Sequence, residues 1–134
     1  MEVHACIDVD DLDKAIAFYE RALGLEAKRR FRNDWAELLG ASSAIDLLVK
    51  DSGTAPCRGS SVRSYDRHWT PVHLDFVVTN LDEAVQRATA AGAVLERDID
   101  RQTWGRMANF ADPFGHGFCL IEFRGRGYDE IATT

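Results

Sequence analysis

Two stretches of this sequence match each other without a gap: His4-Ala-Cys-Ile-Asp-Val-Asp-Asp-Leu-Asp-Lys-Ala15 and His73-Leu-Asp-Phe-Val-Val-Thr-Asn-Leu-Asp-Glu-Ala84. Both begin with a histidine and end in the same Leu-Asp-x-Ala pattern. Self-similarity on this scale indicates that one supersecondary unit, of about 60 residues, occurs twice in the chain. The sequence therefore predicts a duplicated architecture.

Each copy begins with a strand that runs into a helix. Apolar side chains alternate from Val3 to Val9, as on a strand with one buried face. Asp11 then stands where a helix N-cap is expected, and apolar residues follow at helical spacing from Leu12 to Leu23. Gly24 fits the residue that ends a helix. The first copy thus opens as strand and helix.

The rest of each copy reads as three strands. In the first copy we expect strands over 26–32, 35–39 and 44–50. In the second copy we expect a strand over 72–78, a helix over 81–91 and strands over 94–100, 104–111 and 117–123. The predicted fold class is α+β, a single domain over 1–134 built from two tandem βαβββ repeats. The repeats cover about 3–50 and 72–123, with a linker over 51–70 and a short tail over 124–134.

Composition excludes several classes of function. The chain has 16 Lys and Arg against 22 Asp and Glu, a net charge of −6, which disfavours nucleic acid and anionic membrane surfaces as partners. No apolar run approaches the ~18 residues of a membrane span, and the N-terminal residues do not resemble a signal peptide. Three cysteines form no disulfide framework, so we expect a cytoplasmic protein.

Two motifs resemble a known family. The opening His4-x-x-Ile-x-Val-x-Asp-Leu-Asp-x-Ala-x-x-Phe-Tyr-x-x-x-Leu-Gly24 and the ending Phe110-Ala-Asp-Pro-Phe-Gly-His-Gly-Phe-Cys-Leu-Ile-Glu122 are similar to those of the vicinal oxygen chelate superfamily. The resemblance implies that each repeat curls into a half-barrel, that the mixed sheet is barrel-like with helices on its outer face, and that the protein is a homodimer. It also implies a divalent metal held by first-strand and last-strand residues of both repeats: His4, Asp46, His73 and Cys119.

The last-strand positions depart from the pattern of the family. Glyoxalase I-like members carry Glu at both, whereas this chain has Asp46 and Cys119. Glu122 does not replace Cys119, because strand alternation places residues three apart on opposite faces.

Strand alternation places all four candidates on the faces turned away from the helices. Two imidazoles, one carboxylate and one thiol approach a tetrahedral zinc set. We therefore expect zinc, with nickel, cobalt or iron as alternatives and a metal-free pocket also open. Cys6 and Asp75 share these faces and are alternative ligands or groups that hold the imidazoles.

The resemblance makes a glyoxalase-type lyase or isomerase the expected enzyme, one that stabilises an enediolate of a small oxygen-rich substrate on the metal. Asp46 is the candidate base, with Glu37 as a second carboxylate. The predicted substrate-binding residues are Trp35, Glu37, Trp104, Arg106 and Asn109. A metal-free small-molecule or drug-binding protein of the bleomycin-resistance type is the alternative, and a dioxygenase is the second alternative.

Overall fold

Each repeat contains one helix, and capping residues define both of its ends. In the computed structural model, which describes residues 1–134, helix α1 (Leu12–Leu23) starts where the Asp11 side chain accepts a hydrogen bond from the backbone N–H of Lys14. Helix α2 (Leu81–Ala91) starts in the same way, with Asn80 accepting from Glu83. Gly24 and Gly92 end the helices with φ angles of 69° and 109°, which suit glycine. Both predicted helices are confirmed with their bounds.

The first repeat forms a four-stranded sheet. Its strands are β1 (His4–Val9), β2 (Glu26–Phe31), β3 (Trp35–Leu39) and β4 (Ala44–Val49), in the order β1-β4-β3-β2. The first and last strands of the repeat pair in parallel, and the other neighbours are antiparallel. Helix α1 supplies the crossover that a parallel pair requires. The predicted strands of this half are confirmed to within a residue.

The second repeat forms the corresponding sheet, with one interruption. Its strands are β5 (Leu74–Val77), β6 (Val94–Leu95), β7 (Asp100–Gln102), β8 (Gly105–Ala111) and β9 (Gly117–Phe123), in the order β5-β9-β8-β6 with β7 also on β8. A single strand over 94–100 was expected and is wrong. Four residues separate the Leu95–Phe110 and Asp100–Met107 pairs on one side, but only two on β8, so the ladder bulges there.

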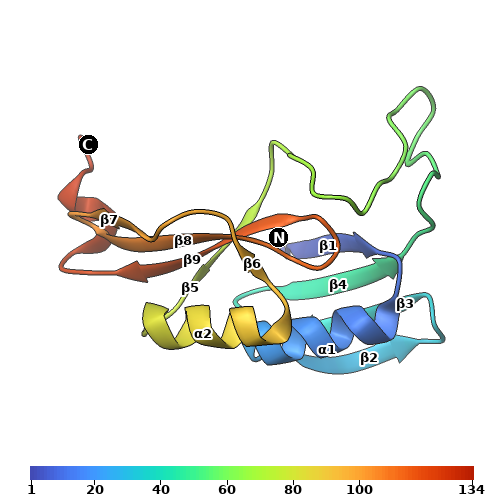
Figure 1. Cartoon of the computed structure of the whole chain (residues 1–134), viewed down its shortest axis with the longest axis horizontal. Helices are drawn as coiled ribbons and strands as arrows, with labels where there is room; N and C mark the ends of the chain where they lie inside the picture. The colour runs from blue at the N-terminus through green and yellow to red at the C-terminus, as the bar shows by residue number, and fades with distance from the viewer.

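The helices lie together along one side of the two sheets, which remain open and do not close into a barrel (Figure 1). One apolar core runs through both halves, from Phe18 on α1 to Leu81 on α2 and Phe118 on β9. The segment between β4 and β5 arches over the opposite side (Figure 1). Ion pairs fasten it to both halves: Arg63 with Asp8 at 2.6 Å, and Arg67 with Glu96.

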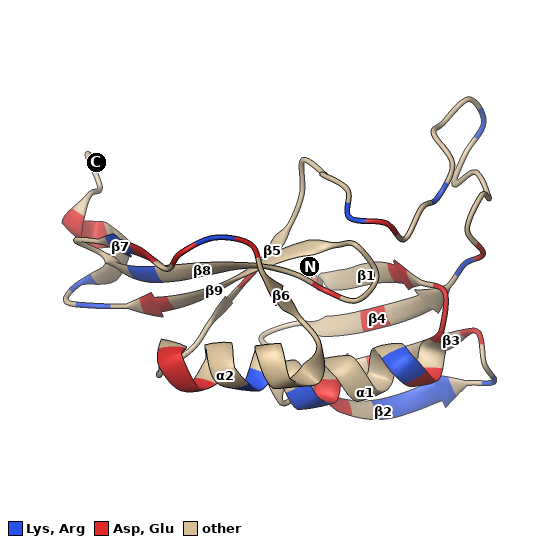
Figure 2. Cartoon of the chain, viewed as in Figure 1, with Lys and Arg blue, Asp and Glu red and all other residues tan.

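Charge is spread over the surface in both signs (Figure 2). The densest basic stretch lies on β2, at Lys28, Arg29 and Arg30, and each of these side chains has a carboxylate partner. No helix of the structure is both long and apolar enough to cross a bilayer.

A partly buried charge network holds the start of α2 on its sheet. Arg106 donates to Asp82 at 3.0 Å and to Glu122 at 2.8 Å. Glu122 also accepts the free backbone N–H of Leu81 at the helix N-terminus, at 2.8 Å. Arg106, followed by this N–H, lowers the pKa of Glu122 to about 2. The network therefore stabilises the folded state only while Glu122 is ionised.

This network predicts acid sensitivity. Because the folded-state pKa of Glu122 lies below its unfolded value, its stabilisation is present above the ordinary Glu pKa and is lost as pH falls toward about 2. The variant Glu122→Gln should be less stable than the wild type at pH 7, and its free energy of unfolding should fall less steeply in acid. Urea denaturation from pH 7 to pH 2 measures this, with Glu26→Gln on exposed β2 as the control. Parallel curves for Glu122→Gln and the wild type would contradict the assignment.

Candidate functional site

The strand register places polar residues in a row across the first sheet. Cys6 on β1 lies opposite Asp46 on β4, Asp46 lies opposite Glu37 on β3, and Glu37 lies opposite Arg29 on β2. Cross-strand partners share a face, so this row lies on the side of the sheet away from the core residues Ile45 and Leu47. The parallel pairing of β1 with β4 is what makes Cys6 and Asp46 neighbours.

The second sheet carries the equivalent row with the acid and the thiol exchanged. Asp75 on β5 lies opposite Cys119 on β9, and Cys119 lies opposite Asn109 on β8. Arg97 completes the row by donating to the side-chain oxygen of Asn109 at 2.7 Å. The first half thus reads Cys, Asp, Glu and Arg where the second half reads Asp, Cys, Asn and Arg.

In the first half, His4, Glu37 and Asp46 form a cluster whose ligand atoms lie within 4.8 Å of one another. Both oxygens of Asp46 have partners: the Nδ1 atom of His4 lies 2.8 Å from one, and the indole N–H of Trp35 donates to the other at 3.1 Å. Hydrogen bonds from the His4 ring to Asp46 and then Glu2 raise the pKa of His4. Asp46 therefore orients the His4 ring and favours its protonation.

The other carboxylate of this cluster is neutralised. Arg29 donates to both oxygens of Glu37, at 2.8 and 2.5 Å. This pair lowers the pKa of Glu37, although burial opposes the effect. A carboxylate with a lowered pKa and a bidentate partner is a weak proton acceptor.

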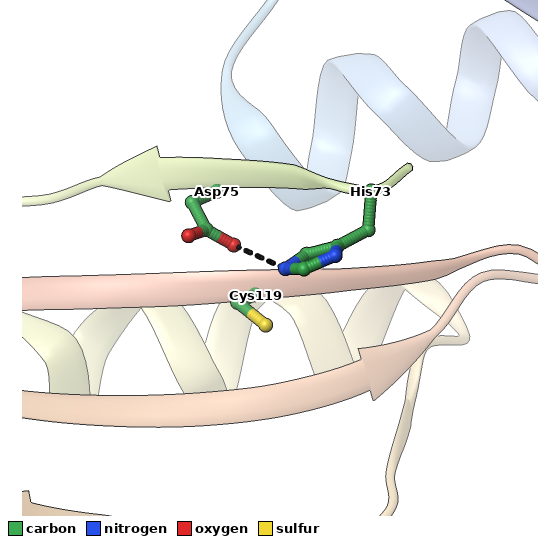
Figure 3. A group of neighbouring side chains, drawn as sticks. All are labelled: His73, Asp75 and Cys119. Carbon is green, nitrogen blue, oxygen red and sulfur yellow. Dashed lines mark ion pairs between the residues drawn. The ribbon is translucent and has the colours of Figure 1, made fainter. Parts of the chain in front are cut away.

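In the second half, His73, Asp75 and Cys119 form a second cluster within the same 4.8 Å limit (Figure 3). The Nε2 atom of His73 lies 3.1 Å from Asp75, and the Asn109 amide donates to the Cys119 sulfur at 3.1 Å. Cys119 is buried, whereas His73 and Asp75 are exposed. Burial and then the Asp75 charge raise the pKa of Cys119 to about 11. The cluster offers one nitrogen, one oxygen and one sulfur.

Two cavities adjoin the clusters. One, of about 360 Å³, is lined by His73, Cys119, Asn109, Arg97 and Trp69, among others. The other, of about 640 Å³, is lined by both His4 and His73. The two histidines of the predicted four-ligand set thus line one cavity, whereas Cys119 lines only the smaller one and Asp46 lines neither, and the four residues belong to separate clusters within the chain.

The structure distributes the predicted substrate-binding residues over different surroundings. The Trp35 ring stacks on the Phe31 ring with their centroids 4.2 Å apart, and its indole N–H donates to Asp46. Trp104 packs against Phe123 and Tyr128. Arg106 is buried in the network under α2, on the face opposite Asn109. Of the five predicted residues, only Asn109 lines either of the two cavities.

Three residues of the site were missed or ranked low on sequence. Asp75 was placed below Cys119 as a ligand, although it lies on the same face two residues after His73. Arg97 falls in the bulged segment that was expected to be regular strand, so its direction could not be deduced. Trp69 lies in the linker, where no periodicity exists to place it.

The thiols should differ in reactivity. At pH 8 a pKa of about 11 in place of 9.0 leaves Cys119 with about a hundredfold smaller thiolate fraction. Iodoacetamide should therefore label the exposed Cys6 and Cys57 first, as followed by peptide mass spectrometry. The variant Asp75→Asn should speed the labelling of Cys119. Equal labelling rates for all three cysteines would contradict the geometry.

The chain is similar to proteins of known family. A profile of the glyoxalase-like domain matches residues 4–121. An uncharacterized protein of Mycobacterium bovis is 34% identical over 131 residues, covering 94% of this chain and 86% of that protein. A lactoylglutathione lyase of Salmonella typhimurium is 27% identical over 127 residues, covering 93% of this chain and 94% of the lyase.

Solved structures share the fold. The fosfomycin resistance protein FosX from Listeria monocytogenes superposes with a TM-score of 0.71 at 22% identity, covering 94% of this chain and 95% of FosX. A mutant form of FosX, solved with Mn(II) and dihydroxypropylphosphonic acid, gives a TM-score of 0.68 at 24% identity over 88% of this chain and 86% of that chain.

Proposed function

Because this chain belongs to the glyoxalase-like family of the vicinal oxygen chelate superfamily, we propose that it is a metal-dependent lyase or isomerase acting on a small oxygen-rich carbonyl or hydroxy substrate. The observation that carries this proposal is the cluster of His73, Asp75 and Cys119 beside a cavity. Both the lyase of Salmonella typhimurium and the Mn(II)-bound FosX lend support as relatives.

The donor set of the second cluster fits a transition metal. An imidazole, a carboxylate and a thiol resemble the three protein ligands of catalytic zinc sites, which leave a coordination position for substrate. The thiol disfavours magnesium and calcium and favours zinc, with nickel, cobalt or iron next. The Asn109 amide that donates to the sulfur would support a thiolate at Cys119.

The first cluster is better suited to proton transfer than to holding the metal alone. Both of its carboxylates already have strong donors, Trp35 and His4 on Asp46 and Arg29 on Glu37. A metal bound there would have to displace or compete with these contacts. The His4 ring, oriented by Asp46, faces the cavity that His73 also lines.

The proposed chemistry follows from these roles. A metal at the second cluster would polarise a substrate carbonyl, which acidifies the neighbouring C–H bond. In its neutral form, with the Nδ1 hydrogen donated to Asp46, the His4 ring would accept that proton at Nε2, which must first leave the exposed Glu2 carboxylate 3.2 Å away; Asp46 then stabilises the charged ring. Asp46 is thus a positioning residue for the base, and Glu37 is set aside because Arg29 neutralises it.

A homodimer would complete the site. Strands β1 and β5 lie at the edges of their sheets, and Val3, Val72 and Val77 are exposed on or beside them. A second copy that docks its first half against the second half of this chain would bring His4 and Asp46 to His73 and Cys119. Such a dimer would bring the four ligands predicted from the sequence together across two subunits, and this four-ligand site stays a prediction.

The alternatives have less support. A drug-binding protein would use the aromatic side chains that line the larger cavity, Tyr19, Phe76 and Phe118, but this function gives the cluster of His73, Asp75 and Cys119 no role. A dioxygenase site of two His and one carboxylate would require His4 and His73 to share one metal, and they belong to separate clusters within the chain.

Metal analysis and proton exchange test the proposal together. Protein purified without a His tag should contain divalent metal, and the variants His73→Ala and Cys119→Ser should each contain about one equivalent per chain less than the wild type. His4→Ala should retain the metal but lose the exchange of the C–H protons of hydroxyacetone with D₂O by at least about a hundredfold. Proton NMR follows the exchange, and mass spectrometry follows the metal.

A matched control and two contrary outcomes sharpen the test. Trp104→Phe changes an aromatic residue outside both clusters and should leave metal and exchange unchanged. Metal retained at full occupancy in Cys119→Ser and His73→Ala would overturn the assignment of the ligands. Loss of the metal in His4→Ala would instead support the four-ligand site and contradict a base role for His4.

A further inference from the structure

All four histidines of the chain line the cavity of about 640 Å³, and two of them have no part in the proposed chemistry. His68 lies in the linker, and His116 lies directly before β9, after the turn at Asp112–Gly115. Their rings meet edge to face with the Nδ1 atom of His116 only 3.2 Å from the Nε2 atom of His68. This contact joins segments 48 residues apart.

In each ring, the outer nitrogen faces away from the other histidine and the inner nitrogen faces toward it. The protonation of the outer nitrogen determines whether the inner nitrogen of a neutral ring carries a hydrogen. The Nε2 atom of His116 lies 2.6 Å from the backbone oxygen of Asp8, and the Nδ1 atom of His68 lies 2.8 Å from that of Asp66. Carbonyl oxygens only accept hydrogen bonds, so both outer nitrogens must carry hydrogen. In neutral rings the two inner nitrogens are therefore bare, and their lone pairs face one another.

Bare nitrogens at this distance repel unless a proton or a metal ion lies between them. A tetrahedral ion with bonds of about 2.0–2.1 Å separates two ligand nitrogens by roughly 3.3 Å and the ring centres by roughly 5.2 Å. A straight N–H···N bond of this length would separate the ring centres by roughly 5.5 Å. The observed centroid distance is 5.0 Å, so the two nitrogens converge on a point beside the line that joins them.

From this geometry we propose that His68 and His116 form a second metal site, which takes a divalent transition metal such as zinc, nickel, cobalt or copper. Two imidazole nitrogens suit these ions and not magnesium or calcium. The backbone carbonyls behind the rings are the partners that ligating histidines normally have, and they fix the required tautomers. Water from the cavity supplies the remaining ligands.

A metal bound here would cross-link the linker to the segment before β9. The backbone N–H of His68 already donates to the Gly115 oxygen at 3.2 Å, and the ion would add a bond between the same two segments. The neighbouring positive charge of Arg67 is paired with Glu96, which reduces its repulsion of a cation. The bound ion therefore holds the linker against β9 over the cavity that His4 and His73 share.

The test uses the full chain with the other candidate ligands removed. In the double variant His4→Ala and His73→Ala, zinc titration by calorimetry should still show one site per chain. Adding His68→Ala should weaken this binding at least about tenfold. Long-range ¹H–¹⁵N NMR of the histidine rings should show zinc shifting the His68 Nε2 and His116 Nδ1 signals.

Val62→Ala, at an exposed position of the same linker, is the matched control and should bind zinc like the double variant. Zinc binding that does not change on His68→Ala would place the ion elsewhere and overturn the proposal. Ring signals that show a proton shared between the two histidines and do not respond to zinc would also overturn it.

Discussion

The candidate site depends on parallel pairing between the first and last strand of each repeat. β1 pairs with β4, and β5 pairs with β9, so side chains more than 40 positions apart become neighbours, as His4 and Asp46 do. A hairpin cannot make such a pair, and the helix in each repeat provides the required crossover. Any change that shifts this register by one residue would turn His4 and Cys119 away from their partners, because strand side chains alternate between faces.

The duplicated halves have diverged in a way that separates their roles. Exchange of acid and thiol leaves each half with an imidazole, a carboxylate and a sulfur on one sheet face. In the first half Glu37 forms an ion pair with Arg29, and Asp46 is hydrogen-bonded to Trp35 and His4. In the second half neutral Asn109 stands at the position equivalent to Glu37. The charge of Arg97 is therefore not balanced by a carboxylate at this position, and Arg97 lines the cavity. The charged side chains of the first half therefore have partners within that half, whereas those of the second half are available to bind a metal and an oxygen-rich ligand.

Much of this could be deduced from the sequence, because short-range chemistry determines it. Caps at Asp11 and Asn80 and glycines at 24 and 92 set the helices, and alternation correctly placed Asp46 and Cys119 on the face away from the core. The same alternation shows that Arg106 and Asn109, three residues apart, cannot both face the cavity.

What could not be deduced depends on long-range placement. The bulge that directs Arg97 toward Asn109 arises from unequal spacing against β8, which no local pattern reveals. The linker that brings Trp69 and His68 over the second sheet is held by ion pairs with distant residues, such as Arg67 with Glu96. Separation of the four predicted ligands into two clusters is likewise a property of the chain's tertiary arrangement.

Anomalous diffraction from crystals grown with zinc would show directly which side chains hold the metal. We expect a metal peak about 2.3 Å from the Cys119 sulfur and about 2.0–2.1 Å from a ring nitrogen of His73, with Asp75 in reach as the third ligand. Full zinc density elsewhere in the chain, with the Cys119 sulfur and the His73 ring remote from any ion, would contradict it.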